Sequence, residues 1–275
     1  MKTIRTIITL ALLVICTMAQ SQTTYKEAFK AMVESSPSAM NSLSPEKMET
    51  AIEGINKMAL KNYTSAESER LVKKYVKEKF MDDLIEAIIP YLENNVSVAE
   101  LNELTATMLT PQGKIFQEHQ TIVNSKTDEF ETLGANIAES VMSGEETKNI
   151  QPIDCPNSYK KLFEEYYAES GLSESVLPML DVYAKLGDTT PSQKEAFNKM
   201  KQYFAENLPT IYLNASYGVF TEDDLKFGIK LYRSTAWKHE MKAVKDMTTH
   251  VQEFGMNFLM SYLLWLNEQG VDLNM

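Results

Sequence analysis

Apolar residues recur along this chain at three- and four-residue spacing, and the alternation typical of β-strands is nearly absent. Side chains at this spacing share one face of an α-helix. The clearest stripes lie in two long segments, 111–143 and 235–268. The stripes are Ile115, Ile122, Phe130, Leu133, Ile137 and Val141 in the first segment, and Val244, Met247, Val251, Phe254, Phe258, Tyr262 and Trp265 in the second. The pattern predicts an all-α fold.

Helix-start signals divide the rest of the chain. Ser97 precedes Glu100 by three residues, which predicts a capping box, and Thr221 precedes Asp224 in the same way. Asp224 has the shorter side chain, so we expect it to interact with the helix dipole rather than to bond back to the cap. Thr110 is expected to cap the helix that follows it. The predicted helices are 24–36, 44–61, 65–94, 98–109 and 111–143, then 158–170, 173–186, 191–215, 222–233 and 235–268, with Pro90, Pro178 and Pro209 expected to kink or interrupt three of them.

The two halves of the chain share an order of residues. The segments 97–114 and 221–238 have the same length, and Thr110 and Lys114 of the first correspond to Ser234 and Lys238 of the second. Upstream, Tyr25 and Phe29 have counterparts at the same spacing, which are Tyr159 and Phe163. Such self-similarity is typical of internal repeats. We therefore predict two tandem helical bundles from an internal duplication, packed through their long closing helices, with repeats at 22–146 and 158–270, a linker at 147–157 and a tail at 271–275.

Residues 1–21 have the pattern of a secretory signal peptide. Lys2 and Arg5 precede an apolar run at 7–15, and small or polar residues follow. The run is far shorter than the roughly 20 residues of a membrane-spanning helix, and no other segment reaches that length. The signal predicts export to the periplasm or the extracellular space. Lipid attachment at Cys16 is disfavoured, because Ile15 stands where a lipid-attachment motif needs a small residue.

The charge of the chain excludes one class of partner. With 27 basic and 38 acidic residues its net charge is -11, and removal of Lys2 and Arg5 with the signal makes it -13. Nucleic acids would be repelled by this charge. After signal removal Cys155 is the one remaining cysteine, so no internal disulfide is expected.

The corner of the first half resembles a known family. The segment Thr110-Pro111-Gln112-Gly113-Lys114, between a capped helix and a long helix, is similar to exported bacterial helical proteins catalogued as domain of unknown function 2059. In the second half, 221–225 and 232–234 resemble the helix before the corner, whereas Thr235 and Trp237 replace its Pro and Gly. The resemblance covers most of the mature chain as two degenerate copies. The family has no established activity, so the resemblance implies a helical fold and export, and no particular chemistry.

The sequence contains no recognisable catalytic or metal-binding motif. Of the three histidines, His239 and His250 lie on one helix face roughly 16 Å apart by the helical rise, too far to share a metal, and His119 falls near an apolar seam. Adjacent acidic residues point in different directions from a helix and are best interpreted as solvated faces. We therefore assign no catalytic residue, no metal ligand and no cofactor.

Aromatic residues are concentrated in the second half. The segment 254–266 is apolar on nearly every side, which favours a core helix between the halves or, alternatively, a groove. Trp237 stands where the first half has Gly113, so it is expected either in the core or as an exposed anchor beside Tyr232. The candidate binding surface comprises Tyr232, Trp237, His239, Tyr262 and Trp265.

Three functions remain open on these grounds. The first is a non-enzymatic interaction module that binds a protein partner. The second is a carrier of a small apolar or amphiphilic ligand between helices, which a cavity lined by Tyr and Trp would favour. The third is a hydrolase whose carboxylates assemble only in the fold, which two opposed carboxylates with shifted pKa values would favour.

Overall fold

The computed structural model describes residues 24–37, 65–127, 150–173 and 191–271, together with the single positions 45, 49, 52, 140 and 177. Within these ranges the chain forms ten helices and no strand, and the prediction of an all-α fold is confirmed. An isolated bridge joins Tyr217 and Phe220. No helix in the described ranges is long and apolar enough to cross a membrane. The predicted signal peptide, Pro178, most of the predicted helices 44–61 and 173–186, and the linker before residue 150 lie outside the described residues.

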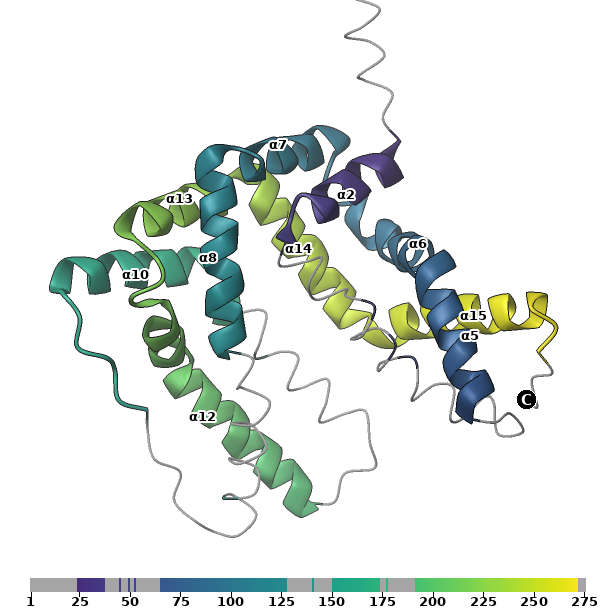
Figure 1. Cartoon of the computed structure of the whole chain (residues 1–275). Helices are drawn as coiled ribbons and strands as arrows, with labels where there is room; N and C mark the ends of the chain where they lie inside the picture. The colour runs from purple at the N-terminus through teal and green to yellow at the C-terminus, as the bar shows by residue number, and fades with distance from the viewer. Residues whose placement is uncertain are drawn as a thin grey trace, which may run out of the picture.

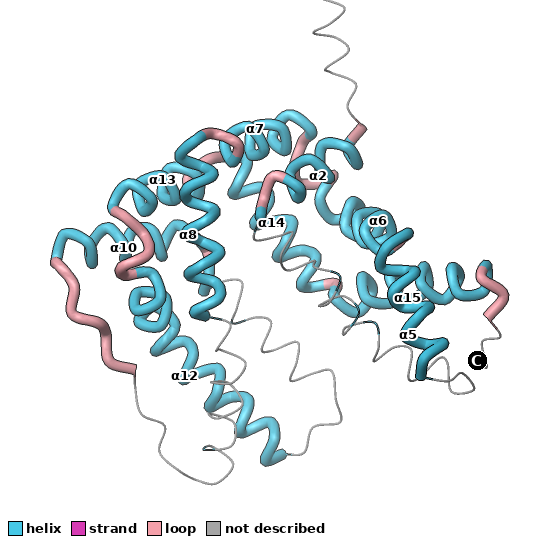
Figure 2. The backbone as a smooth tube through the Cα atoms, viewed as in Figure 1, coloured by secondary structure: helices cyan, strands magenta, loops and turns pink. Residues whose placement is uncertain are grey.

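The helices form two lobes that meet at α7 (Figure 1). The first lobe contains α2 (Tyr25–Glu34), α5 (Ser65–Glu78), α6 (Phe80–Leu92), α7 (Val98–Met108), α14 (Thr235–Thr249) and α15 (Val251–Glu268). The second contains α8 (Pro111–Thr127), α10 (Asn157–Ser170), α12 (Pro191–Ser216) and α13 (Glu222–Tyr232). Short loops connect α7 to α8 and α13 to α14 (Figure 2).

The lobes do not coincide with the two halves of the sequence. Helix α8 belongs to the first half but packs against α12 and α13 of the second, and α14 belongs to the second half but packs against α6 and α7 of the first. Within each half, the opening helix packs on the capped helix: α2 on α7, and α10 on α13. The closing helices are thus exchanged between the halves. The duplication itself stays a prediction.

The two corners are formed by side-chain caps, as expected. The Gly113 N–H donates to Thr110 Oγ1 at 3.1 Å, and the Trp237 N–H donates to Ser234 Oγ at 3.2 Å. A Cβ on Gly113 would clash with the carbonyl oxygen of Thr107. The backbones of α7 and α8 therefore lie too close together at the first corner for any side chain at this position. The second corner accommodates the largest side chain, Trp237, at the matching position.

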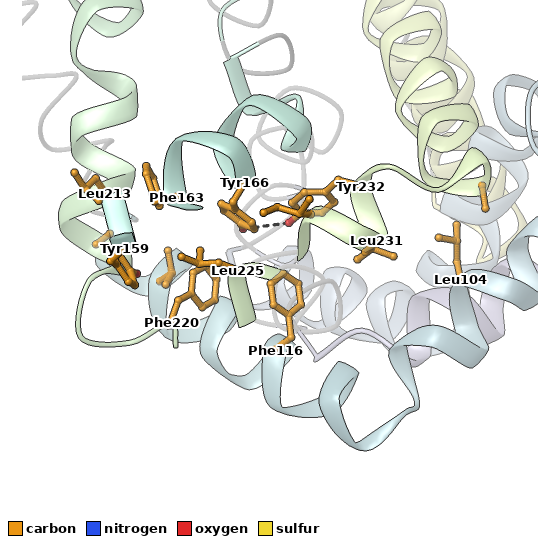
Figure 3. Close-up of a cluster of buried hydrophobic side chains, with 14 residues drawn as sticks. Leu104, Phe116, Tyr159, Phe163, Tyr166, Leu213, Phe220, Leu225, Leu231 and Tyr232 are labelled. Atoms are coloured by element: carbon orange, nitrogen blue, oxygen red, sulfur yellow. Dashed lines mark hydrogen bonds between the residues drawn. The ribbon is translucent and has the colours of Figure 1, made fainter. Parts of the chain in front are cut away.

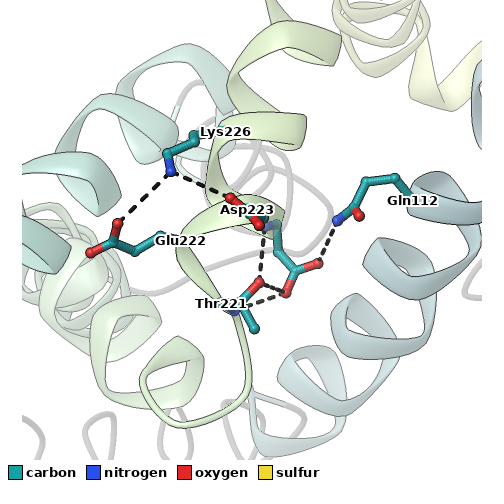
Figure 4. A network of polar contacts seen from close by, with 6 residues as sticks. Gln112, Thr221, Glu222, Asp223 and Lys226 are labelled. Carbon is teal, nitrogen blue, oxygen red and sulfur yellow. Dashed lines mark hydrogen bonds and ion pairs between the residues drawn. The ribbon is translucent and has the colours of Figure 1, made fainter.

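Both capped helices carry a complete capping box, which corrects one expectation. The Ser97 N–H donates to Glu100 Oε2 at 2.8 Å, as predicted. The Thr221 N–H likewise donates to Asp224 Oδ2 at 2.8 Å, so the expectation that Asp224 only interacts with the dipole was wrong. The Asp224 carboxylate is fully buried, so it has no water to bond and accepts from the backbone of its own cap. Gln112 Nε2 donates to its other oxygen at 3.2 Å (Figure 4).

Two predicted long helices are broken. The segment 65–94 divides at Lys79, whose backbone leaves the helical region and whose side chain binds the Asp83 carboxylate at 2.8 Å. The segment 235–268 divides at His250, whose ring Nδ1 lies 2.8 Å from the Asp246 carbonyl oxygen and competes for it with the helix backbone. Pro90 and Pro209 lie inside α6 and α12 and do not interrupt them.

The buried side chains form four clusters, and both halves of the sequence contribute to three of them. The largest lies in the second lobe and joins Phe116 of α8 to Tyr166 of α10 and Tyr232 of α13 (Figure 3). A second cluster packs Tyr75 of α5 against Tyr262 and Trp265 of α15. A third joins α2, α6 and α7 to Ala243 of α14. The halves therefore share their cores.

Candidate functional site

A cavity of about 570 Å³ lies between the two lobes. Its described walls come from α2 and α6, from α7 and α8, from the end of α10, and from α13 and α14. The cavity separates the core cluster around Phe116 from the cluster around Phe29, and both of these rings line it. Its volume falls in the range of about 300–1,000 Å³ that is typical of small-molecule sites. Because it lies where the exchanged helices α8 and α14 face one another, both halves of the chain build it.

The walls of this cavity are mainly apolar and flexible. Four methionines contribute to the lining and give it an adaptable surface. Leucine, isoleucine and valine side chains from α2, α6, α7, α13 and α14 complete most of the wall. Three large aromatic rings with polar atoms also line it, namely Tyr91, Tyr232 and Trp237. Such a lining favours a ligand with a substantial apolar body.

Trp237 presents a buried donor without an acceptor. It is partly buried, and its ring centre lies 4.8 Å from that of Tyr232. Its indole Nε1 is buried and has no hydrogen-bond partner among the described residues. A buried donor left unpaired costs about 1–3 kcal/mol. Of the two alternatives for Trp237, the exposed anchor was wrong, because the ring is partly buried and lines the cavity.

Gln117 presents the complementary group, a buried acceptor without a donor. Its amide Nε2 donates to the Met108 carbonyl oxygen at 3.0 Å, which fixes the orientation of the side chain. Its Oε1 is buried and has no partner among the described residues. Gln117 lies on α8 and Trp237 on α14, so the two unpaired atoms come from different helices that line the cavity.

Tyr232 is held in place by a hydrogen-bonded pair of tyrosines. Its hydroxyl lies 3.1 Å from that of Tyr166 (Figure 3), and the Tyr166 hydroxyl donates to Gln120 Oε1 at 3.0 Å. Burial raises the pKa of Tyr166 well above its usual value, so the hydroxyl stays protonated. A Cβ on Gly228 would lie 2.5 Å from the Tyr166 ring, so the absence of a side chain there lets α10 and α13 approach closely.

Glu240 is an acidic side chain in this apolar surrounding. It follows Trp237 by three residues on α14 and lines the same cavity. Burial raises the pKa of its carboxyl group to about 7. No hydrogen bond or ion pair links it to another described residue. A carboxyl group with this pKa is close to half ionised at neutral pH, and shifts of this kind are frequent at functional sites.

The five residues predicted as one binding surface occupy three places. Tyr232 and Trp237 meet at the cavity. His239 lies beside it in sequence, but its Nδ1 is 2.7 Å from Glu100 Oε1, so it ties α14 to α7. Tyr262 and Trp265 are buried in the separate cluster on α5. The prediction of one surface was wrong, because the break at His250 turns α15 away from the cavity.

The polar groups of the cavity could not be identified from the sequence. In the sequence Glu240 stands among other charged residues of a helix, and Gln117 belongs to no recognisable motif. Among the described residues no group of three or more His, Cys, Asp or Glu side chains is placed to hold a metal ion. The described lining contains no second carboxylate to oppose Glu240, which an acid–base pair would require.

Comparison with known proteins finds no match for this chain. No model of a protein family matches the chain, and no curated protein or solved structure matches it either.

Proposed function

We propose that this protein binds an amphiphilic small molecule in the cavity between its two lobes. The observation that carries the proposal is a pair of buried polar atoms without a described partner, Trp237 Nε1 and Gln117 Oε1, in a mainly apolar cavity. An oxygen atom of a ligand would accept from Trp237, and a hydroxyl or amine group would donate to Gln117. The methionine and aliphatic walls would enclose the apolar body. A hydrogen bond from the ligand to each of these atoms would remove the cost of burying it unpaired, which is about 1–3 kcal/mol per atom.

A neutral fluorescent probe tests whether the cavity accepts apolar molecules. We expect N-phenyl-1-naphthylamine to bind the purified chain with increased emission, and Val244→Trp to abolish that binding because the indole fills space lined by Val244. Ile122→Trp is the matched control, since it adds the same side chain at a position of α8 that is 46% exposed and does not line the cavity. Probe binding to a folded Val244→Trp variant with the original affinity would reject the cavity as the site.

The interaction module expected from the sequence is a second proposal, supported by a different surface. On α15, Met256, Met260 and Leu264 follow one another at four-residue spacing and are 56%, 45% and 61% exposed. The segment 254–266, for which a core helix or a groove was expected, thus has one buried face, with Tyr262 and Trp265, and one exposed apolar face. An exposed apolar stripe on a helix is a common element of helix-in-groove recognition. Loss of a co-purified partner after Met260→Lys, with probe binding retained, would support this second role.

The cellular location is also a proposal. Lys2, Arg5 and the apolar run at 7–15 support export through a cleaved signal peptide. N-terminal sequencing of the protein from an envelope or culture fraction tests this. A mature chain that begins near residue 22 is expected, and a cytosolic chain that retains Met1 would contradict it.

A further inference from the structure

Among the described residues that line the cavity, one carries a full charge, and it is acidic. This residue is Glu240, and the described lining residues include no lysine, arginine or histidine. On α2, Tyr25 interacts electrostatically with Glu240, and its pKa is raised to about 12 by burial and by the carboxylates of Glu93, Glu240 and Glu100. Tyr25 is therefore neutral and supplies no counter-charge. An anionic head group in this cavity would face Glu240 without a cation to balance it.

The aromatic groups beside Glu240 suit a cation. Residues three apart on a helix lie on the same face, about 5–6 Å apart at their Cβ atoms, so Trp237 and Glu240 border the same region. The Trp237 ring packs on Tyr232, with ring centres 4.8 Å apart. Indole and phenol faces attract ammonium groups, and the attraction grows when the cation is removed from water. One carboxylate and two aromatic side chains therefore line the same mainly apolar cavity.

A bound cation would also compensate the unfavourable placement of the Glu240 carboxylate in an apolar cavity. An ionised carboxylate that is removed from water is costly unless it is paired, and no described residue pairs with Glu240. His239, its neighbour on α14, is engaged by Glu100 at 2.7 Å. Lys238 and Lys242 are exposed and do not line the cavity. None of the described residues therefore supplies a cation for Glu240, and a bound ligand could supply one.

We infer that the ligand of this cavity is a cationic amphiphile, an amine or quaternary ammonium group on an apolar chain, with its charged end held between Glu240 and the Trp237–Tyr232 pair. This inference rests on the proposed ligand-binding function. It narrows the chemical class of the ligand by charge. Long-chain alcohols would fill the cavity without using Glu240, and fatty acids would place a second negative charge beside it.

Three probes of one chain length and different charge test the inference. We expect decyltrimethylammonium to displace N-phenyl-1-naphthylamine about tenfold more tightly than 1-decanol, and decanoate to be the weakest competitor. The quaternary ammonium group keeps its charge at every pH, so the probe itself does not titrate. Glu240→Gln should remove the tenfold preference for the cation and leave the affinity for 1-decanol unchanged. Glu253→Gln, at an exposed position of α15, is the control for the general negative charge of the chain.

The outcomes separate the two proposals. If none of the three probes displaces N-phenyl-1-naphthylamine, or if that dye does not bind, the proposed ligand-binding function fails. If 1-decanol binds but decyltrimethylammonium is no tighter, or if Glu240→Gln leaves its advantage intact, the cavity binds apolar molecules and the inference about charge is overturned. Equal loss in Glu253→Gln and Glu240→Gln would also overturn it, because the attraction would then come from the whole surface.

Discussion

At the scale of single residues, the feature that needs an explanation is Glu240. Its carboxyl group lies in an apolar cavity without a described partner, an arrangement that stabilises nothing in the empty protein. A glutamine or methionine at this position would fold at least as well. Natural chains carry such locally unfavourable groups mainly at functional sites. The energetic cost of Glu240 in the empty protein can therefore be measured as a test of its environment.

Glu240→Gln should stabilise the empty protein in a pH-dependent way. Burial raises the pKa of Glu240 from its ordinary value of 4.5 to about 7, so between these values the folded state binds more protons than the unfolded state. The stability of the original protein therefore falls as pH rises through this window. We expect the variant and the original to unfold alike at pH 4, and the variant to be more stable by on the order of 1–3 kcal/mol at pH 8. Urea denaturation at both pH values checks this. An equal effect at the two pH values would show that the carboxyl group is solvated.

At the scale of helices, the corners and caps were predictable because their chemistry is local. Thr110, Ser97 and Thr221 each act within three residues of their own position, so the sequence alone identifies them as caps. The helix breaks were not predictable in this way. The break at Lys79 depends on Asp83, which also accepts from the buried hydroxyl of Tyr75 at 2.9 Å. Contacts of that kind form only after the helices pack.

The Thr110 cap should contribute about 1 kcal/mol to the free energy of unfolding. Thr110→Ala removes the oxygen that accepts the Gly113 N–H and leaves that donor at the start of α8 without its cap. The denaturant midpoint should fall accordingly, with an unchanged slope. Thr110→Ser keeps the hydroxyl and is the control. If both variants have the midpoint of the original protein, the cap contributes nothing at this corner.

The two equivalent capping carboxylates should differ in their contribution. Asp224 is fully buried, and besides its own cap it binds Gln112 at 3.2 Å and His119 at 2.8 Å, both on the exchanged helix α8. Glu100 caps its own helix at a more exposed site and binds His239. We expect Asp224→Ala to cost about 3 kcal/mol or more, because it leaves several buried groups unpaired. Glu100→Ala should cost about 1 kcal/mol. Thermal unfolding of the two variants compares them, and a smaller loss in Asp224→Ala would contradict the proposed link between α8 and α13.

At the scale of the whole molecule, the exchange of α8 and α14 decides where the site lies. The cavity is formed between walls that come from opposite halves of the sequence, with Gln117 and Trp237 more than a hundred positions apart. Periodicity could predict that Trp237 and Trp265 lie on helices. It could not separate them into a cavity wall and a core cluster, because that depends on which helices face each other. For the same reason Glu240 looked like an ordinary charged residue of an amphipathic helix.

The exchange also predicts that the two halves need each other to fold. In a fragment of residues 22–148, Phe116 and Val123 of α8 would lose the second-half residues that bury them, and in a fragment of residues 149–275, Ala243 and Trp265 would lose their first-half partners. Exposed apolar surface of this kind leads to partial folding or self-association. We therefore expect each fragment alone to show no cooperative unfolding as a monomer.

When the two fragments are mixed, we expect a one-to-one complex with restored helical circular dichroism and restored binding of N-phenyl-1-naphthylamine. The intact chain is the control for both signals, and analytical ultracentrifugation gives the stoichiometry. Two independent bundles would give the opposite result, with cooperative monomeric unfolding of each fragment and no complex. A self-associated fragment 149–275 that forms a symmetric dimer would agree with the exchange, since a second copy could supply the closing helix that the missing half no longer provides. Such a dimer would also support the predicted duplication. A single ancestral copy of the repeat would have exchanged its closing helix with a second copy in the same way.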